Sequence, residues 1–276
     1  MTAQLSHQDL IAHARRLHEA GALAEARALY ARLLERAPDN PEVLHLAGVA
    51  AYQGGAPADA VPLIRRALAD KPDFAPAWQN LVLPLLDLGQ LDEAVAAGER
   101  AVALAPEKAG VWTNYVLALI RAGRLDEAGR KAEVAIAIAP GDPAAWSQLG
   151  HIRLAQGHAE DAERLLLRAL ALAPSHEEAL YNHGVAAQAL MQDAAAEKSY
   201  RAVLAANPAH RGARLNLGVA LRSQGRIIEA LAIWHASTTP PEAWPELAYD
   251  IACARLMAGD WAAGWAGYEL DRKSVV

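Results

Sequence analysis

The stretch AGVWTNYVLALIRAGRLDEAGRKAEVAIAIAPGD, residues 109–142, decides the fold because it contains two helical patterns separated by a glycine. Gly123 ends the first helix, since glycine enters the left-handed conformation at a helix end without steric cost. Acidic residues then open the second helix, and Pro140 stops it. The stretch therefore predicts a helical hairpin. Its first helix carries apolar residues at the i, i+3, i+4, i+7 spacing of an amphipathic helix: Trp112, Tyr115, Val116 and Leu119.

The same pattern recurs every 34 residues, and a period of this size built from helix-favouring residues predicts a solenoid of stacked helical hairpins. Met191 stands where one glycine is missing, so we expect the turn of that repeat to be longer or less tight. The in-phase glycines are Gly21, Gly55, Gly89, Gly123, Gly157, Gly225 and Gly259. The in-phase prolines are Pro38, Pro72, Pro106, Pro140, Pro174 and Pro208.

Eight repeats fit the chain, with position 1 of each at the residues given at the end of this paragraph. We expect residues 1–6 to be an N-terminal tail and residues 7–244 to form repeats 1–7. Residues 245–276 then form repeat 8, truncated or capping, after an irregular junction at 235–245 (HASTTPPEAWP). The starts are His7, Pro41, Ala75, Ala109, Pro143, Glu177, Arg211 and Pro245.

Several anchors recur in phase: W-x-x-L-G at Trp146, Leu149 and Gly150, glycine at position 15, alanine at position 20 and proline at position 32. With these anchors the chain resembles the tetratricopeptide repeat (TPR) family. The resemblance implies an all-α, right-handed superhelical solenoid of about eight helix-turn-helix TPR units. It also implies a scaffold that binds a protein or an extended peptide, whose first helices line a concave face with positions 2, 5, 6, 9, 12 and 13.

Position 6 carries a carboxamide in five consecutive repeats, a set that we call the amide row: Asn80, Asn114, Gln148, Asn182 and Asn216. A primary amide offers a donor and an acceptor, so it can bind the backbone of an extended peptide whatever its side chains are. The alternative is that these amides solvate the groove or hydrogen-bond within it. The row is similar to the asparagine ladder of O-linked N-acetylglucosamine transferases. Nearby residues expected to supply selectivity are Tyr181, His151, Thr113 and Gln79.

Repeats that clamp a C-terminal carboxylate place Lys or Arg at positions 5 and 9 together, which this chain does not do, so that role is disfavoured. The net charge of −6 disfavours a nucleic-acid partner, because phosphate binding needs a concentrated basic surface. No apolar run approaches 18 residues, so we expect no membrane span. The single cysteine, Cys253, suits a reducing compartment, and we expect a cytoplasmic protein.

The sequence contains no glycine-rich phosphate loop, no H-E-x-x-H and no nucleophile elbow. We therefore expect no active site, no cofactor and no metal, and hence not an enzyme. Trp78, Trp112 and Trp146 recur at position 4 and are expected to be core residues. The ten histidines are expected to be exposed or in the groove.

The segment GDWAAGWAGYELDRK, residues 259–273, resembles the end of the repeat arrays of some bacterial glycosyltransferases, just before their catalytic portion. The opening of the chain also resembles repeat arrays fused to glycosyltransferase or sulfotransferase domains. An alternative function is therefore recruitment of substrates for a bacterial O-linked glycosyltransferase whose catalytic domain is absent from this chain. A further possibility is self-association through an apolar edge of the C-terminal repeat, near Trp261 and Trp265.

Overall fold

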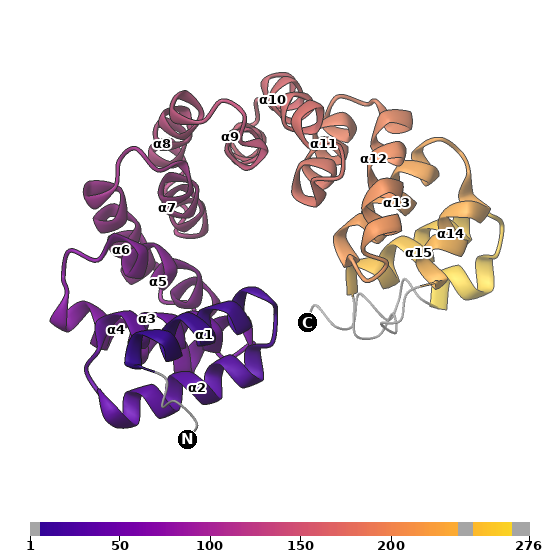
Figure 1. Cartoon of the computed structure of the whole chain (residues 1–276). Coiled ribbons are helices and arrows are strands. Elements are labelled where there is room, and N and C mark those ends of the chain that lie inside the picture. The colour runs from indigo at the N-terminus through magenta and orange to yellow at the C-terminus, as the bar shows by residue number, and fades with distance from the viewer. Residues whose placement is uncertain (1–5, 237–244, 267–276) are drawn as a thin grey trace. The chain divides into compact units, whose positions relative to one another are not determined.

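The computed structural model describes residues 6–236 and 245–266, and every regular element among them is a helix (Figure 1). First helices have 13 residues and second helices 14, except α14 with nine. The hairpin bounds are α1 (His7–Glu19) and α2 (Leu23–Arg36), α3 (Pro41–Gln53) and α4 (Pro57–Asp70), α5 (Ala75–Asp87) and α6 (Leu91–Leu104), α7 (Ala109–Arg121) and α8 (Leu125–Ile138). They continue with α9 (Pro143–Ala155) and α10 (Ala159–Leu172), α11 (Glu177–Ala189) and α12 (Asp193–Ala206), α13 (Arg211–Ser223) and α14 (Ile227–His235), and α15 (Pro245–Met257), followed by helical residues 261–266.

Two compact bodies make up the chain, one ending at Pro140 and the other beginning at Gly141. Within each body, every hairpin packs on the next, and each described helix contacts only the next helix along the chain or the one after it. Consecutive first helices also touch, as α3 and α5 do in one body and α11 and α13 in the other, whereas second helices of consecutive repeats do not among the described residues. The first helices are therefore the more closely spaced layer in each body (Figure 1).

Each hairpin turn has a left-handed residue at the predicted position, and Met191 adopts the same conformation as the glycines, with φ of 58°. Its turn closes with the hydrogen bonds seen elsewhere: Gln192 N–H donates to Ala187 O at 2.8 Å, as His158 N–H donates to Arg153 O at 2.8 Å. The expectation of a longer or less tight turn at Met191 is wrong. A methionine can occupy this place because its side chain is 90% exposed and meets no obstruction.

The two helices of a hairpin cross at position 20, where seven alanines have no exposed surface, as the pattern predicts. The two helices also fit together at positions 8 and 24, where in several repeats a glycine on the first helix faces a large side chain on the second. A Cβ on Gly218 would lie 2.0 Å from Trp234 Nε1, and one on Gly184 would lie 2.4 Å from Tyr200 Cε1. Repeats 2 and 5 pair Gly48 with Ile64 and Gly150 with Leu166. In repeat 3 the glycine is at position 24 instead, and a Cβ on Gly98 would lie 2.7 Å from Tyr115 Cδ2 on the first helix of the next repeat.

Side chains also satisfy the free N–H groups that begin several first helices. Asn40 Oδ1 accepts from Val43 N–H at 3.2 Å, and Asp142 Oδ1 accepts from Ala144 N–H at 3.0 Å. In α11 and α13 an imidazole does the same, with Nδ1 of His176 and of His210 as the acceptor. α14 ends early, at His235, and most of the junction expected to be irregular lies outside the described residues.

Candidate protein-binding surface

In the N-terminal body, Asn80 on α5 reaches back to the first helix of the preceding repeat. Its Nδ2 donates to His45 Nε2 at 2.9 Å. His45 is 7% exposed and packs edge-on against Phe74, with 4.9 Å between ring centroids. Burial lowers the pKa of His45 from 6.5 to about 4, against the opposing effect of a hydrogen bond to the Pro76 carbonyl. The imidazole is therefore neutral near pH 7 and can accept the amide proton.

Asn114 on α7 makes the corresponding contact one repeat later. Its Nδ2 donates to the backbone carbonyl of Gln79 at 3.3 Å, again on the preceding first helix. The neighbouring Thr113 donates its hydroxyl to the Gly110 carbonyl of its own helix at 3.2 Å. Asn80, Asn114, Thr113 and Gln79 are all half-buried, so part of each side chain faces solvent.

In the C-terminal body, Asn216 on α13 lies in a cluster of hydroxyls and amides. Its Nδ2 is 3.4 Å from both Tyr181 Oη, on the preceding first helix, and Tyr200 Oη. The Tyr200 hydroxyl donates to Gln188 Oε1 at 2.6 Å, and burial raises the pKa of that phenol, so Tyr200 is a neutral donor. Tyr181 also contacts the His210 ring at 4.8 Å between centroids.

A common rule emerges from these contacts: a position 6 amide donates to position 5 of the repeat before it, 35 residues earlier. The two remaining members of the amide row, Gln148 and Asn182, are 6% and 5% exposed. Among the described residues, Asn182 Nδ2 and the buried Ser147 Oγ have no hydrogen-bond partner. Of the two alternatives from sequence, bonding within the groove thus occurs for at least three of the five amides, and peptide contact stays a prediction.

Five aliphatic side chains at position 9, one helical turn after the amide row, were missed as candidate site residues. Each is half-buried on a first helix, so an apolar stripe runs beside the amides within each body. Period and register could have found them, because position 9 belongs to the same expected face as position 6. His151 occupies position 9 in repeat 5 and is also half-buried. The stripe comprises Val49, Leu83 and Leu117 in one body and Val185 and Val219 in the other.

His183 contradicts the expectation that all ten histidines are exposed or in the groove, whereas His45, although buried, lies at groove position 5 beside Asn80. His45 and His183 are 7% and 8% exposed, and His183 Nδ1 lies 2.8 Å from Ser199 Oγ. Burial lowers the pKa of His183, which keeps this pair neutral in the core. The three tryptophans at position 4 are half-buried rather than enclosed in the core. Two of them are anchored by a hydrogen bond: Trp78 Nε1 donates to the Pro72 carbonyl at 2.8 Å and Trp112 Nε1 to the Pro106 carbonyl at 2.7 Å.

No cluster of three or more His, Cys, Asp or Glu side chains that could hold a metal ion occurs in residues 6–236 and 245–266. Over the same residues, no helix has the length and apolar character needed to cross a bilayer.

Trp261 is 62% exposed on the helical residues 261–266 and Trp265 is 52% exposed, so the apolar edge expected in repeat 8 exists. Self-association through it stays a prediction.

Three family models, each described as a tetratricopeptide repeat, match residues 17–82, residues 81–143 with 192–236, and residues 143–186. The chain belongs to the tetratricopeptide repeat family. Its all-α fold of TPR hairpins, as expected from sequence, is thereby confirmed. TPR membership indicates a protein-binding scaffold, without a specific ligand.

Solved structures agree with this TPR fold. The APC/C hetero-tetramer Cut9-Hcn1 is 16% identical with a TM-score of 0.71, covering 90% of this chain and 49% of that one. PilW, a type IV pilus biogenesis factor, is 20% identical with a TM-score of 0.68, covering 79% of this chain and 100% of that one. A tetratricopeptide repeat protein from Parabacteroides merdae is 13% identical with a TM-score of 0.62, covering 84% and 92%.

These identities are low, so the likeness shows the TPR fold alone, and this chain spans about half the length of the Cut9-Hcn1 chain that it matches. No curated protein matches the chain. None of these matches supports an origin in a glycosyltransferase or sulfotransferase.

Proposed function

We propose that this TPR protein holds an extended segment of a partner protein across its first-helix face. The observation that carries the proposal is the repeated pairing, within each body, of a position 6 amide with an aliphatic residue at position 9. The amides bind the partner's backbone and the aliphatic stripe accepts its apolar side chains. Asn80, Asn114, Gln148, Asn182 and Asn216 supply backbone contacts, while Tyr181, His151, Thr113 and Gln79 supply selectivity.

The internal hydrogen bonds support this role because they orient the amides. A carboxamide has two N–H donors and an oxygen acceptor. In Asn114, one N–H is bound by the preceding helix, which leaves the oxygen and the second N–H for a ligand. In Asn216, Nδ2 contacts the hydroxyls of Tyr181 and Tyr200, which leaves the oxygen for a ligand. Both side chains are half-buried, whereas Gln148 and Asn182 are buried. Asn114 and Asn216 are therefore the strongest candidates, one in each body.

Geometry sets the length of the segment that each repeat can serve. Packed helices lie about 8–10 Å apart, and an extended chain advances about 3.3 Å per residue. One repeat therefore spans about three residues of partner chain. A partner with an apolar side chain at about every third residue would contact the stripe while its backbone meets the amides.

A random peptide library displayed on phage provides the probe, and the tightest binder is then measured against variants by fluorescence anisotropy. Asn114→Ala and Asn216→Ala should each weaken binding about twofold to tenfold, since a neutral hydrogen bond contributes about 0.5–1.5 kcal/mol. Gln192→Ala, at an exposed amide in a hairpin turn, should leave affinity unchanged. The proposal would be contradicted if the double variant Asn114→Ala, Asn216→Ala kept the affinity of wild type. It would also be contradicted if Gln192→Ala lost affinity as Asn114→Ala and Asn216→Ala do.

A second probe tests backbone recognition itself. N-methylation of single amides in the selected peptide removes one backbone donor without changing any side chain. We expect affinity to fall at sites spaced about three residues apart and to be unaffected between them. Equal sensitivity at every site, or none at any, would show that the amide row does not bind peptide backbone.

A further inference from the structure

A second surface lies in the C-terminal body where the first helix α13 meets the second helices α12 and α14. A pocket of about 320 Å³ opens there, a size in the range of small ligand sites. Its floor and walls are apolar and its rim carries two arginines. The residues that matter are Leu204, Pro208, Leu217 and Ile233, with Arg201 and Arg214 at the rim.

The N-terminal body has a pocket in the same register, of about 360 Å³, between α4, α5 and α6. Leu68 corresponds to Leu204 at position 28, and Leu81 corresponds to Leu217 at position 7. The two pockets therefore arise from the repeat geometry. A difference between them must come from individual side chains.

The main difference is at position 4, where the N-terminal pocket has Trp78 and the C-terminal pocket has Arg214. Both residues make the same anchoring contact. Trp78 Nε1 donates to the Pro72 carbonyl, and Arg214 Nη2 donates to the Pro208 carbonyl. Arg214 also donates to the Ile233 carbonyl at 3.4 Å. The guanidinium thus replaces an indole without loss of the contact, and brings a positive charge to the pocket.

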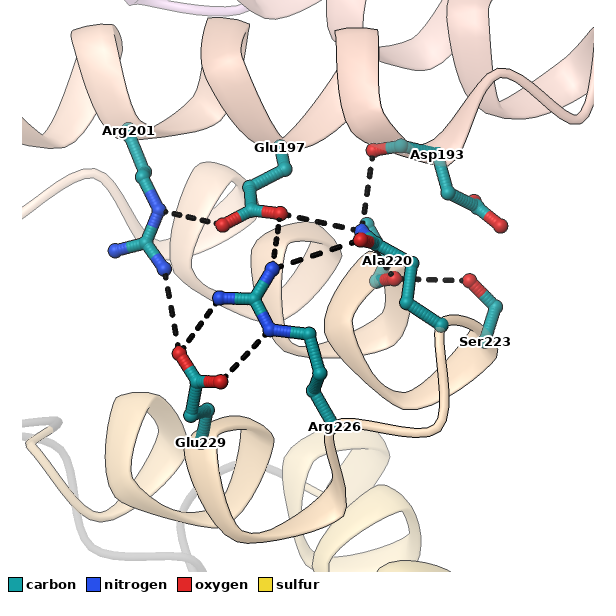
Figure 2. A network of polar contacts seen from close by, with 8 residues as sticks. Asp193, Glu197, Arg201, Ala220, Ser223, Arg226 and Glu229 are labelled. Carbon is teal, nitrogen blue, oxygen red and sulfur yellow. Dashed lines mark hydrogen bonds and ion pairs between the residues drawn. The ribbon is translucent and has the colours of Figure 1, made fainter.

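That charge has no acidic partner among residues 6–236 and 245–266, since both contacts of Arg214 are to neutral carbonyls. The other rim arginine is already neutralised, as Figure 2 shows. Arg201 and Arg226 share the carboxylates of Glu197 and Glu229, two cations with two anions. In the N-terminal pocket, Arg65 pairs with Glu93. Arg214 is the surplus cation, and a guanidinium has five N–H donors, of which carbonyls take two here.

We infer that the C-terminal pocket is a docking site for a partner protein segment in which an apolar side chain is followed directly by a carboxylate. The apolar side chain enters between Leu204, Leu217 and Ile233. The carboxylate binds the remaining donors of Arg214 in a charge-assisted contact, which is stronger than a neutral one. This site goes beyond the proposed function, because it combines positions 4 and 7 of α13 with the second helices α12 and α14, and it recognises side chains rather than backbone.

The test uses the whole chain and two peptides, acetyl-Gly-Ser-Leu-Glu-Ser-Gly-amide and its Leu-Gln counterpart. Binding is monitored through the leucine and isoleucine methyl NMR signals of the protein. The Leu-Glu peptide should shift the methyl signals of Leu204, Leu217 and Ile233, and should bind about tenfold more tightly than the Leu-Gln peptide. Signals of Leu68 and Leu81 provide the internal control, since the N-terminal pocket should not distinguish the two peptides.

Arg214→Trp is the decisive variant because it installs the residue that Trp78 and Trp112 supply at position 4, with the same carbonyl available. We expect it to keep its fold and lose the preference for Leu-Glu. Arg214→Met, a neutral side chain of similar length, gives an independent second variant. Arg168→Trp makes the same change of charge at an exposed site on α10 and should keep the preference.

Four outcomes would overturn the inference, and the first three concern the peptides. The two peptides could bind wild type equally, the preference could survive Arg214→Trp and Arg214→Met, or neither peptide could shift the pocket methyl signals at millimolar concentration. Sedimentation and methyl NMR of wild type without peptide, at increasing protein concentration, complete the test. Shifts of the same methyl signals with protein concentration would identify a second copy of the chain as the occupant and would likewise overturn it.

Discussion

Acidification should destabilise the N-terminal body through His45. Burial lowers the pKa of this imidazole from 6.5 to about 4 in the folded chain. Between these values the unfolded chain binds a proton that the folded chain rejects, so stability is complete above pH 6.5 and falls as the pH decreases. From this difference in pKa, the free energy of unfolding should be lower than at neutral pH by about 3 kcal/mol once the pH is below 4, and by about 2 kcal/mol at pH 5.

The variant His45→Gln isolates this effect, because glutamine has no proton to gain and can still accept from Asn80 Nδ2. Urea unfolding followed by circular dichroism at pH 7.5 and pH 5 gives the free energy of unfolding at each pH. Wild type should lose about 2 kcal/mol more than His45→Gln on acidification. His13→Gln, at an exposed histidine of α1, should behave like wild type. Equal pH dependence in wild type and His45→Gln would refute the reasoning.

Three further predictions concern packing and assembly. Met191→Gly should stabilise the protein by about 1 kcal/mol in thermal unfolding, because it relieves a left-handed residue whose side chain is 90% exposed; a lower melting temperature would contradict this. Gly218→Ala should cost about 1–3 kcal/mol, since the new Cβ would lie 2.0 Å from Trp234 Nε1, while Gly141→Ala, with open space around it, should be neutral. Light scattering should show concentration-dependent mass for wild type and less for Trp261→Ser; monomer at all concentrations would exclude self-association.

Much of the fold could be predicted because it depends on features that repeat. The 34-residue period predicts the left-handed turn residues, the buried alanines and the helix lengths, because the same residue types recur at the same positions in successive repeats. The error at Met191 came from treating the glycine as a requirement. The turn requires a left-handed backbone, and an exposed non-glycine residue reaches it at a modest energetic cost.

The candidate site was less predictable because it depends on pairwise distances between repeats. Register placed Asn80 and Asn216 on the first-helix face, but it could not say that their amides contact His45 and Tyr181 on the preceding helix. His183 and Ser199 share a buried hydrogen bond 16 residues apart, and the helical period alone does not reveal such a pair. Arg214 went unnoticed because a charged residue at a tryptophan position reads as an ordinary departure from the pattern.

The glycines that face large residues within a hairpin have a consequence for how such arrays are recombined. Tyr200 fits against Gly184 because glycine has no Cβ, whereas repeat 3 has Val82 at the position of Gly184, and its Gly98 lies against Tyr115 of the next repeat. Joining the first helix of repeat 3 to the second helix of repeat 6 would set Val82 against Tyr200. The smallest interchangeable module in this protein is therefore the whole hairpin, and a cut between repeats 3 and 4 must also keep Gly98 together with Tyr115.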